Sequence, residues 1–301
     1  MARPEPGEGK PRLTIYDFGR TTFYASRYDQ RFSYCLYVPR DYAEDGTKVY
    51  GLAVTVHGTG RNATGYRDSL ADFADAHDCI VLAPLFPAGI IREGELSNYK
   101  LLEFHGIRFD LVLLSMVDEV AAKYRVNAGR FLLYGFSGGG HFSHRFFYLH
   151  PERLLGVSIG APGVVTLLDT TRDWWVGVRD LASRLGKTLD LDAMRRVAVH
   201  MVVGDRDTET WEITIEPHHR WWMPDANIAG KTRIDRLDAL RRSYEDHGIP
   251  VRLDMVPGAA HEPDKMMGPV RDFFAATLAR HRCAERPATH PGAQEGVGRV
   301  R

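Results

Sequence analysis

Ser137 lies in a short glycine-rich stretch, YGFSGGGHF at residues 134–142, directly after the apolar run RFLL. Residues 135–139 match the pattern Gly-x-Ser-x-Gly, which holds a nucleophilic serine on a sharp turn between a strand and a helix. Glycines on either side of the serine avoid collisions with the neighbouring chain, and the helix that follows points free N–H groups at a developing oxyanion. The pattern predicts that Ser137 is a nucleophile. The alternative is a glycine-rich turn without chemistry.

A serine nucleophile needs a base that takes its proton and a carboxylate that orients the base. The segment GDRDTET, after the apolar run VAVHMVV, offers Asp205 and Asp207, and PGAAHEP, after VRLDMV, offers His261. The first position after a strand usually continues the turn, so we favour Asp207 as the acid and interpret Asp205 as a turn former, although the sequence leaves both open. His261 is the predicted base because it follows the acid on a short loop.

A fourth group lies upstream, where VTVHGTG ends a predicted strand with His57 and Gly58. We expect the backbone N–H groups of Thr59 and Gly138 to form an oxyanion hole. The glycines of GTGRNATG also suggest a phosphate loop, but the Lys-Ser/Thr pair of such a loop is missing, which argues against nucleotide binding.

These groups must be positioned by alternating strands and helices. Strand-like apolar runs are found at 32–38, 51–57, 79–86, 131–136, 154–160, 197–204 and 251–256. Helical patterns are found at 66–78, 109–125, 233–248 and 269–282. The alternation predicts an α/β fold with a doubly wound, mostly parallel sheet that carries helices on both faces. The more polar segments 13–18 and 21–26 are predicted to be antiparallel edge strands ahead of the parallel part.

The stretches VTVHGTGRNATGY, YGFSGGGHFSHRFFYLHPERL, GDRDTE and PGAAHE resemble the α/β-hydrolases, in particular the esterase branch with polyhydroxybutyrate depolymerase-like and feruloyl esterase-like enzymes. The resemblance covers residues 30–280. It implies the α/β-hydrolase fold and a serine esterase with Ser137 as nucleophile, His261 as base, Asp207 as acid, and Thr59 and Gly138 as oxyanion donors. Secreted depolymerases usually carry a signal peptide and disulfides; neither is visible here, which favours a soluble intracellular substrate over a polymer.

Composition bounds the remaining possibilities. The chain has 301 residues and balances 39 basic against 39 acidic ones, which argues against nucleic acid and anionic membranes as partners and favours a small-molecule ester. We expect one hydrolase domain over residues 13–282 with flexible tails at 1–12 and 283–301. No run is long enough to span a bilayer, and Cys35, Cys79 and Cys283 suit reduced thiols, so the predicted location is the cytoplasm. We expect no cofactor and no metal.

Two loops, 164–178 and 208–230, are candidates for the rim of a substrate pocket. They carry the predicted substrate-binding residues Trp174, Trp175, Trp211, Trp221 and Trp222, an aromatic rim that suits an acyl or aromatic group. A metal site at Glu216, His218 and His219 is disfavoured because adjacent side chains seldom converge on one ion. Two alternatives stay open: a peptidase or thioesterase with the same triad, and a non-catalytic binding protein on a hydrolase scaffold.

Overall fold

A computed structural model describes residues 12–285, and six parallel strands form the centre of its main sheet. In spatial order these strands are β5 (Cys79–Leu85), β4 (Gly51–Val56), β8 (Phe131–Phe136), β9 (Leu154–Gly160), β10 (Ala198–Gly204) and β11 (Val251–Val256). All neighbours in this series pair in parallel. The predicted doubly wound, mostly parallel sheet is therefore confirmed.

The antiparallel part of the sheet differs from the prediction in two segments: residues 32–38 belong to it, and residues 13–18 do not. β3 (Ser33–Val38) runs antiparallel to β5, and β1 (Gly19–Arg20) and β2 (Tyr24–Ala25) pair antiparallel with β3. The prediction that residues 32–38 form one of the parallel strands is wrong, because burial on both faces does not fix the direction of a strand. The predicted strand at 13–18 is also wrong.

Local hydrogen bonding explains why residues 13–18 do not form a strand. They contain a short 3₁₀ helix, η1 (Ile15–Asp17). Thr14 caps this helix: its hydroxyl accepts from the backbone N–H of Tyr16, and Asp17 accepts from the backbone N–H of Thr14 at 2.7 Å. Side chains of this kind compete with strand pairing by satisfying the backbone locally.

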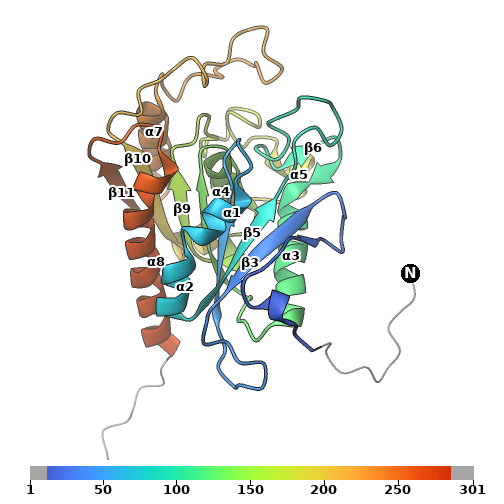
Figure 1. The fold of residues 1–301 in the computed structure, drawn as a ribbon. Coiled ribbons are helices and arrows are strands. Elements are labelled where there is room, and N and C mark those ends of the chain that lie inside the picture. The colour runs from blue at the N-terminus through green and yellow to red at the C-terminus, as the bar shows by residue number, and fades with distance from the viewer. Residues whose placement is uncertain (1–11, 286–301) are drawn as a thin grey trace, which may run out of the picture.

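Helices cover both faces of the sheet. In Figure 1, α1 (Ala63–Asp68), α2 (Ala71–His77) and α8 (Pro263–Glu285) lie in front of the sheet, and α4 (Gly138–Leu149) lies behind it. α3 (Phe109–Lys123) packs on β5, and α7 (Arg233–Glu245) packs on β10 and β11. The minor elements are the hairpin β6 (Glu103–Phe104) with β7 (Ile107–Arg108), η2 (Pro151–Arg153), α5 (Leu181–Leu185) and α6 (Leu191–Arg195).

The helix predicted at 66–78 is divided into α1 and α2. Asn62 caps α1 by accepting from the N–H of Gly65 at 3.0 Å, so helical structure begins earlier than the apolar pattern indicated. The break follows Asp68, where the hydroxyl of Ser69 donates to the carbonyl of Tyr66 at 2.8 Å. A serine that bonds back to the preceding turn favours helix termination or bending.

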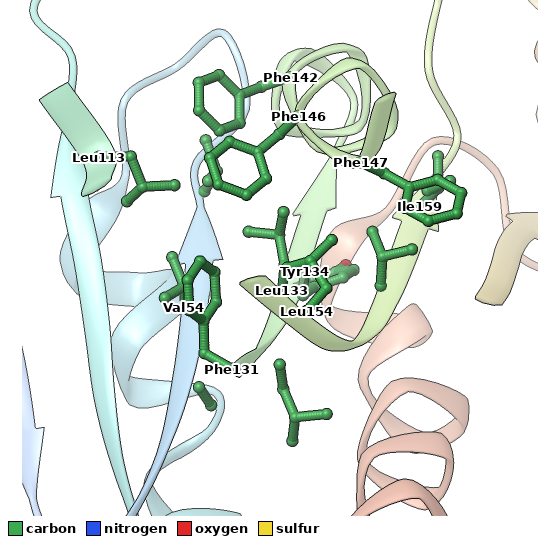
Figure 2. Packing of buried hydrophobic residues seen from close by; sticks show 14 of the residues in the cluster. Val54, Leu113, Phe131, Leu133, Tyr134, Phe142, Phe146, Phe147, Leu154 and Ile159 are labelled. Carbon is green, nitrogen blue, oxygen red and sulfur yellow. The ribbon is translucent and has the colours of Figure 1, made fainter. Parts of the chain in front are cut away.

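Helix α4 is anchored deep in the core, and this anchoring holds the turn that precedes it. Every residue of α4 is buried. Figure 2 shows Phe142, Phe146 and Phe147 reaching from α4 toward β8 and its neighbours. The rings of Phe142 and Phe146 lie 5.8 Å apart, and Phe131 of β8 lies 6.0 Å from Phe146.

Helix α8 continues to Glu285, past the predicted start of the C-terminal tail at 283. The rest of that tail, and residues 1–11 of the predicted N-terminal tail, lie outside the described residues. Cys35 and Cys79 are buried, Cys283 is exposed, and all three are free thiols. Between residues 12 and 285, the chain has no helix long and apolar enough to cross a membrane.

Candidate active site

Ser137 stands on a strained turn between β8 and α4. Its backbone angles are φ 55° and ψ −115°, in a region that costs a non-glycine residue about 1–3 kcal/mol. Its N–H donates to the carbonyl of Gly160 at 2.8 Å. A Cβ atom at Gly135 would lie 2.1 Å from the carbonyl oxygen of Gly139, and one at Gly139 would lie 2.1 Å from that of Val56. The flanking glycines are therefore required by the close approach of neighbouring backbone.

The loops after β10 and β11 bring Asp207 and His261 into contact. His261 Nδ1 and Asp207 Oδ2 are 2.6 Å apart, and Asp207 is 1% exposed. The His261 ring packs against Phe136, with the ring centroids 4.7 Å apart, so the imidazole lies beside the residue that precedes Ser137. The other candidate acid, Asp205, is exposed and accepts from the N–H of Gly258 at 2.8 Å. Asp207 is thus the carboxylate that pairs with the histidine.

Arg233 completes this group, and the sequence analysis missed it. Its guanidinium donates to Asp207 Oδ1 at 3.1 Å and to Glu212 Oε2 at 2.5 Å, and the side chain is 2% exposed. A buried carboxylate such as Asp207 needs a partner of this kind. One signal was present: Arg233 is the first residue of helix α7, where the helix dipole disfavours a cation unless carboxylates face it.

The backbone of Thr59 meets that of Gly138 next to the nucleophile. A Cβ atom at Gly138 would lie 3.1 Å from the Thr59 nitrogen and 2.3 Å from the hydroxyl of Tyr99. Glycine is therefore needed at 138 for the two segments to approach.

His57 fixes the orientation of this backbone. Phe86 N–H donates to His57 Nε2 at 3.0 Å, so the ring proton is on Nδ1, which donates to the carbonyl of Gly58 at 2.8 Å. Because a trans peptide points its C=O and N–H in opposite directions, this bond also sets the direction of the Thr59 N–H. Two N–H groups held side by side in this way can bind an oxyanion.

A cavity of about 80 Å³ opens beside these groups, with Ser137 and Thr59 in its wall. Lys100 and Ser97, from the chain between β5 and β6, form another part of the wall. Both predicted rim loops contribute. Val164 is the first residue of one loop, and the second contributes Glu212, Ile213, Ile215, His219 and Trp221. Figure 1 shows the second loop, drawn in orange, rising above the sheet between β10 and α7.

Solved structures with a similar fold are known. The poly(3-hydroxybutyrate) depolymerase LpqC of Bordetella parapertussis is 25% identical over 83% of this chain and 87% of its own, with a TM-score of 0.63. Poly(aspartic acid) hydrolase-1 of Sphingomonas sp. KT-1 is 21% identical over 90% and 99%, with a TM-score of 0.62. A ferulic acid esterase is 12% identical over 86% and 96%, with a TM-score of 0.58. The chain has the α/β-hydrolase fold. No protein-family model and no curated protein matches the sequence.

The five predicted tryptophans lie in three different environments. Trp221 lines the cavity. Trp174 and Trp175 are buried in the hydrophobic core, and Trp175 Nε1 donates to the carbonyl of Trp221 at 2.9 Å. Trp211 and Trp222 are 77% and 48% exposed. Trp174 and Trp175 therefore fasten their loop to the domain instead of facing the cavity, because indole rings bury a large apolar area when a loop packs on a core.

Within residues 12–285, no group of three or more His, Cys, Asp or Glu side chains is placed to hold a metal ion.

Four buried histidines predict a loss of stability in acid. Burial lowers the pKa of His57 and of His200 to about 4, and it lowers the pKa of His141 and His144 well below the ordinary value. In the unfolded chain these histidines titrate near 6.5, so between about pH 6.5 and about pH 4 the unfolded state binds more protons. The free energy of unfolding is therefore expected to be highest above pH 6.5 and to fall as the pH falls toward 4, by about 3 kcal/mol for His57 alone.

Urea unfolding followed by circular dichroism at pH 7.5, 6.5, 5.5 and 4.5 would measure this slope. His200→Gln, which lies outside the cavity, should flatten it. A slope that is the same in this variant as in the wild type would show that His200 titrates alike in both states.

Proposed function

We propose that the protein is a serine hydrolase that cleaves a carboxylic ester through an acyl-enzyme on Ser137. The observation that carries the proposal is the pairing of His261 with buried Asp207 beside a serine held at φ 55°. Because the Nδ1 proton of His261 is directed at Asp207, the lone pair of Nε2 is free to accept the proton of a serine hydroxyl. The similarity to esterases and depolymerases supports ester hydrolysis as the reaction class.

The reaction then follows from the roles of these groups. Ser137 Oγ attacks the ester carbonyl while His261 takes the hydroxyl proton, and the oxyanion is stabilised by the N–H groups of Thr59 and Gly138. The C–O bond to the alcohol breaks as His261 returns the proton to the leaving oxygen. Water, activated by His261, attacks the acyl-enzyme and releases the acid. Asp207 stays a carboxylate throughout and holds the imidazole in the required tautomer.

Labelling with a fluorophosphonate probe tests the proposal. Such a probe phosphonylates a serine that is activated by a base, and the modified peptide is identified by mass spectrometry. We expect the wild type to be labelled on Ser137 and Ser137→Ala to remain unlabelled. Ser143→Ala is the matched control: Ser143 lies further along α4, is buried, and bonds to the carbonyl of Gly140 at 3.4 Å, so this variant should be labelled like the wild type. An unlabelled wild type would favour a binding protein on a hydrolase scaffold.

A further inference from the structure

The cavity beside Ser137 contains a cation without a paired carboxylate. In the part of the chain that the structure describes, the ammonium group of Lys100 makes no hydrogen bond or ion pair. Two neighbouring cations are paired with carboxylates: Arg233 binds Asp207 and Glu212, and Arg220 donates to Glu95 at 2.6 Å. Among the described residues, Lys100 and Arg233 are the cations in the lining of the cavity and Glu212 is its carboxylate, so the lining carries one net positive charge.

The charges around Lys100 make an anion favourable there. Burial lowers the pKa of this lysine to about 8, and the positive charges of Arg61 and Arg220 lower it as well, while Glu212 and Glu95 act in the opposite direction. The ammonium group is thus charged at neutral pH, but its charge is poorly compensated. A bound anion would supply the missing counter-charge.

The position of Lys100 is fixed by its backbone. Its N–H donates to the carbonyl of Ser97 at 3.2 Å, and its own carbonyl accepts from fully buried Arg145 at 3.0 Å. A Cβ atom at Gly138 would lie 3.1 Å from Lys100 Cε, so the lysine side chain runs past the turn that carries Ser137. A fixed backbone reduces the ordering cost of using this side chain to bind a ligand.

His141 also lines the cavity, and its ring carries a hydrogen-bond donor without a partner within residues 12–285. Its Nε2 accepts from the N–H groups of Gly163 at 2.9 Å and Val164 at 3.3 Å, so the ring proton must be on Nδ1. That Nδ1 is buried and has no partner in the described residues, and His141 is 5% exposed. A buried donor without an acceptor costs free energy, so His141 adds polar character beside Lys100.

The cavity is placed to hold the acyl part of an ester. Ser137 and Thr59 line it, whereas His261 is not among its lining residues. The leaving alcohol takes its proton from His261 and so lies outside the cavity, which leaves the acyl chain inside. At about 80 Å³ the cavity is roughly half the size of one that admits benzene, so it suits a short chain.

We propose that this cavity binds a carboxylate at the end of a short acyl chain, so that the preferred substrates are monoesters of short dicarboxylic acids. Lys100 provides the cation for that carboxylate. Glu212 does not prevent this, because Arg233 already holds it. The inference rests on the ester hydrolase function proposed above and adds its substrate class. Hydrolysis would consume one water and release an alcohol and a dicarboxylate.

A comparison of two ethyl esters tests the proposal. Monoethyl succinate carries the carboxylate, and ethyl succinamate replaces it with a neutral amide of nearly the same shape. Ethanol release gives kcat/KM for each ester, and the ratio of the two values is the selectivity. We expect the wild type to prefer monoethyl succinate by about 10- to 100-fold at pH 7, as a charge-assisted contact implies. Lys100→Met should lower the selectivity at least about tenfold. Lys187→Met, on the exposed loop between α5 and α6, should leave it unchanged.

The pH dependence gives a second readout. The carboxylate of monoethyl succinate stays ionised above pH 7, whereas the free Lys100 ammonium loses its proton around pH 8, so the selectivity should fall between pH 7 and pH 9. Circular dichroism would verify that Lys100→Met is folded. If Lys100→Met does not fold, the selectivity of Lys100→Gln and the pH dependence of the wild-type selectivity are measured instead.

The outcomes separate this inference from the proposed function. Hydrolysis of both esters without preference, or a selectivity that Lys100→Met leaves unchanged, overturns the carboxylate site but leaves the hydrolase intact. If neither ester is cleaved, binding of succinate to Ser137→Ala is measured by calorimetry against succinamate. Binding of succinate that is at least about tenfold tighter, and that is lost in Ser137→Ala/Lys100→Met, supports the site independently of turnover. Equal or absent binding overturns it.

Discussion

Ser137→Ala is expected to lower kcat on short-chain p-nitrophenyl esters by about 10⁴-fold or more, because the nucleophile is removed while the other groups of the site stay in place. The fold should be retained. Alanine has the same backbone cost as serine at φ 55°, and the Ser137 N–H bond to Gly160 does not involve the side chain. We expect the free energy of unfolding to change by less than about 1 kcal/mol.

Kinetics and urea unfolding of the purified variant check both parts of this result. A small residual activity in Ser137→Ala is compatible with Ser137 as the nucleophile, because the oxyanion donors still accelerate hydrolysis by water when the nucleophile is missing. Activity within about tenfold of the wild type, in a correctly folded variant, would show that another group attacks the ester.

Asp207→Asn is expected to lower kcat by about 10⁴-fold through the tautomer of His261. Arg233 donates to Oδ1 of Asp207, so the amide oxygen of an asparagine should turn toward Arg233 and its NH₂ group toward His261. The histidine would then accept at Nδ1 and carry its proton on Nε2, where it can no longer take the serine proton. The effect is on kcat, and KM should change little.

Asp205→Asn is the matched control for this variant. Asp205 lies two residues away on the same loop and accepts from the N–H of Gly258, a bond that the amide oxygen of asparagine can also accept. Its kcat should stay within about threefold of the wild type, since surface substitutions of this kind have small effects. A larger loss in Asp205→Asn than in Asp207→Asn would transfer the acid role to Asp205.

The sequence by itself determined much of the fold. Apolar runs of strand length, separated by helical patterns, located the parallel strands to within a residue or two, because a buried strand must be apolar on both faces. The direction of β3 could not be predicted in this way, since antiparallel and parallel strands in the interior have similar composition. Local capping by Thr14 and Asn62, which hydrophobic periodicity does not detect, accounts for two of the elements that were misplaced.

For the candidate site, local pattern determined the position of Ser137. A Cβ atom at position 135 or 139 would lie about 2 Å from a backbone carbonyl oxygen, so both positions require glycine. The requirement is therefore visible in the sequence as the Gly-x-Ser-x-Gly pattern. His261 and Asp207 were found through their places after strands, but the choice between Asp205 and Asp207 needed the distance to His261.

Only the tertiary structure revealed Arg233, Lys100 and the position of Trp221. Their roles depend on which charges and rings the fold brings next to them from distant segments. A lysine in a loop looks like a surface residue in sequence, and the place of Arg233 at the start of a helix does not say which carboxylates face it. The turn that holds the nucleophile is encoded locally, because steric constraints act between near neighbours. The charge of the cavity is decided by the fold, because electrostatic pairing acts between residues far apart in the chain.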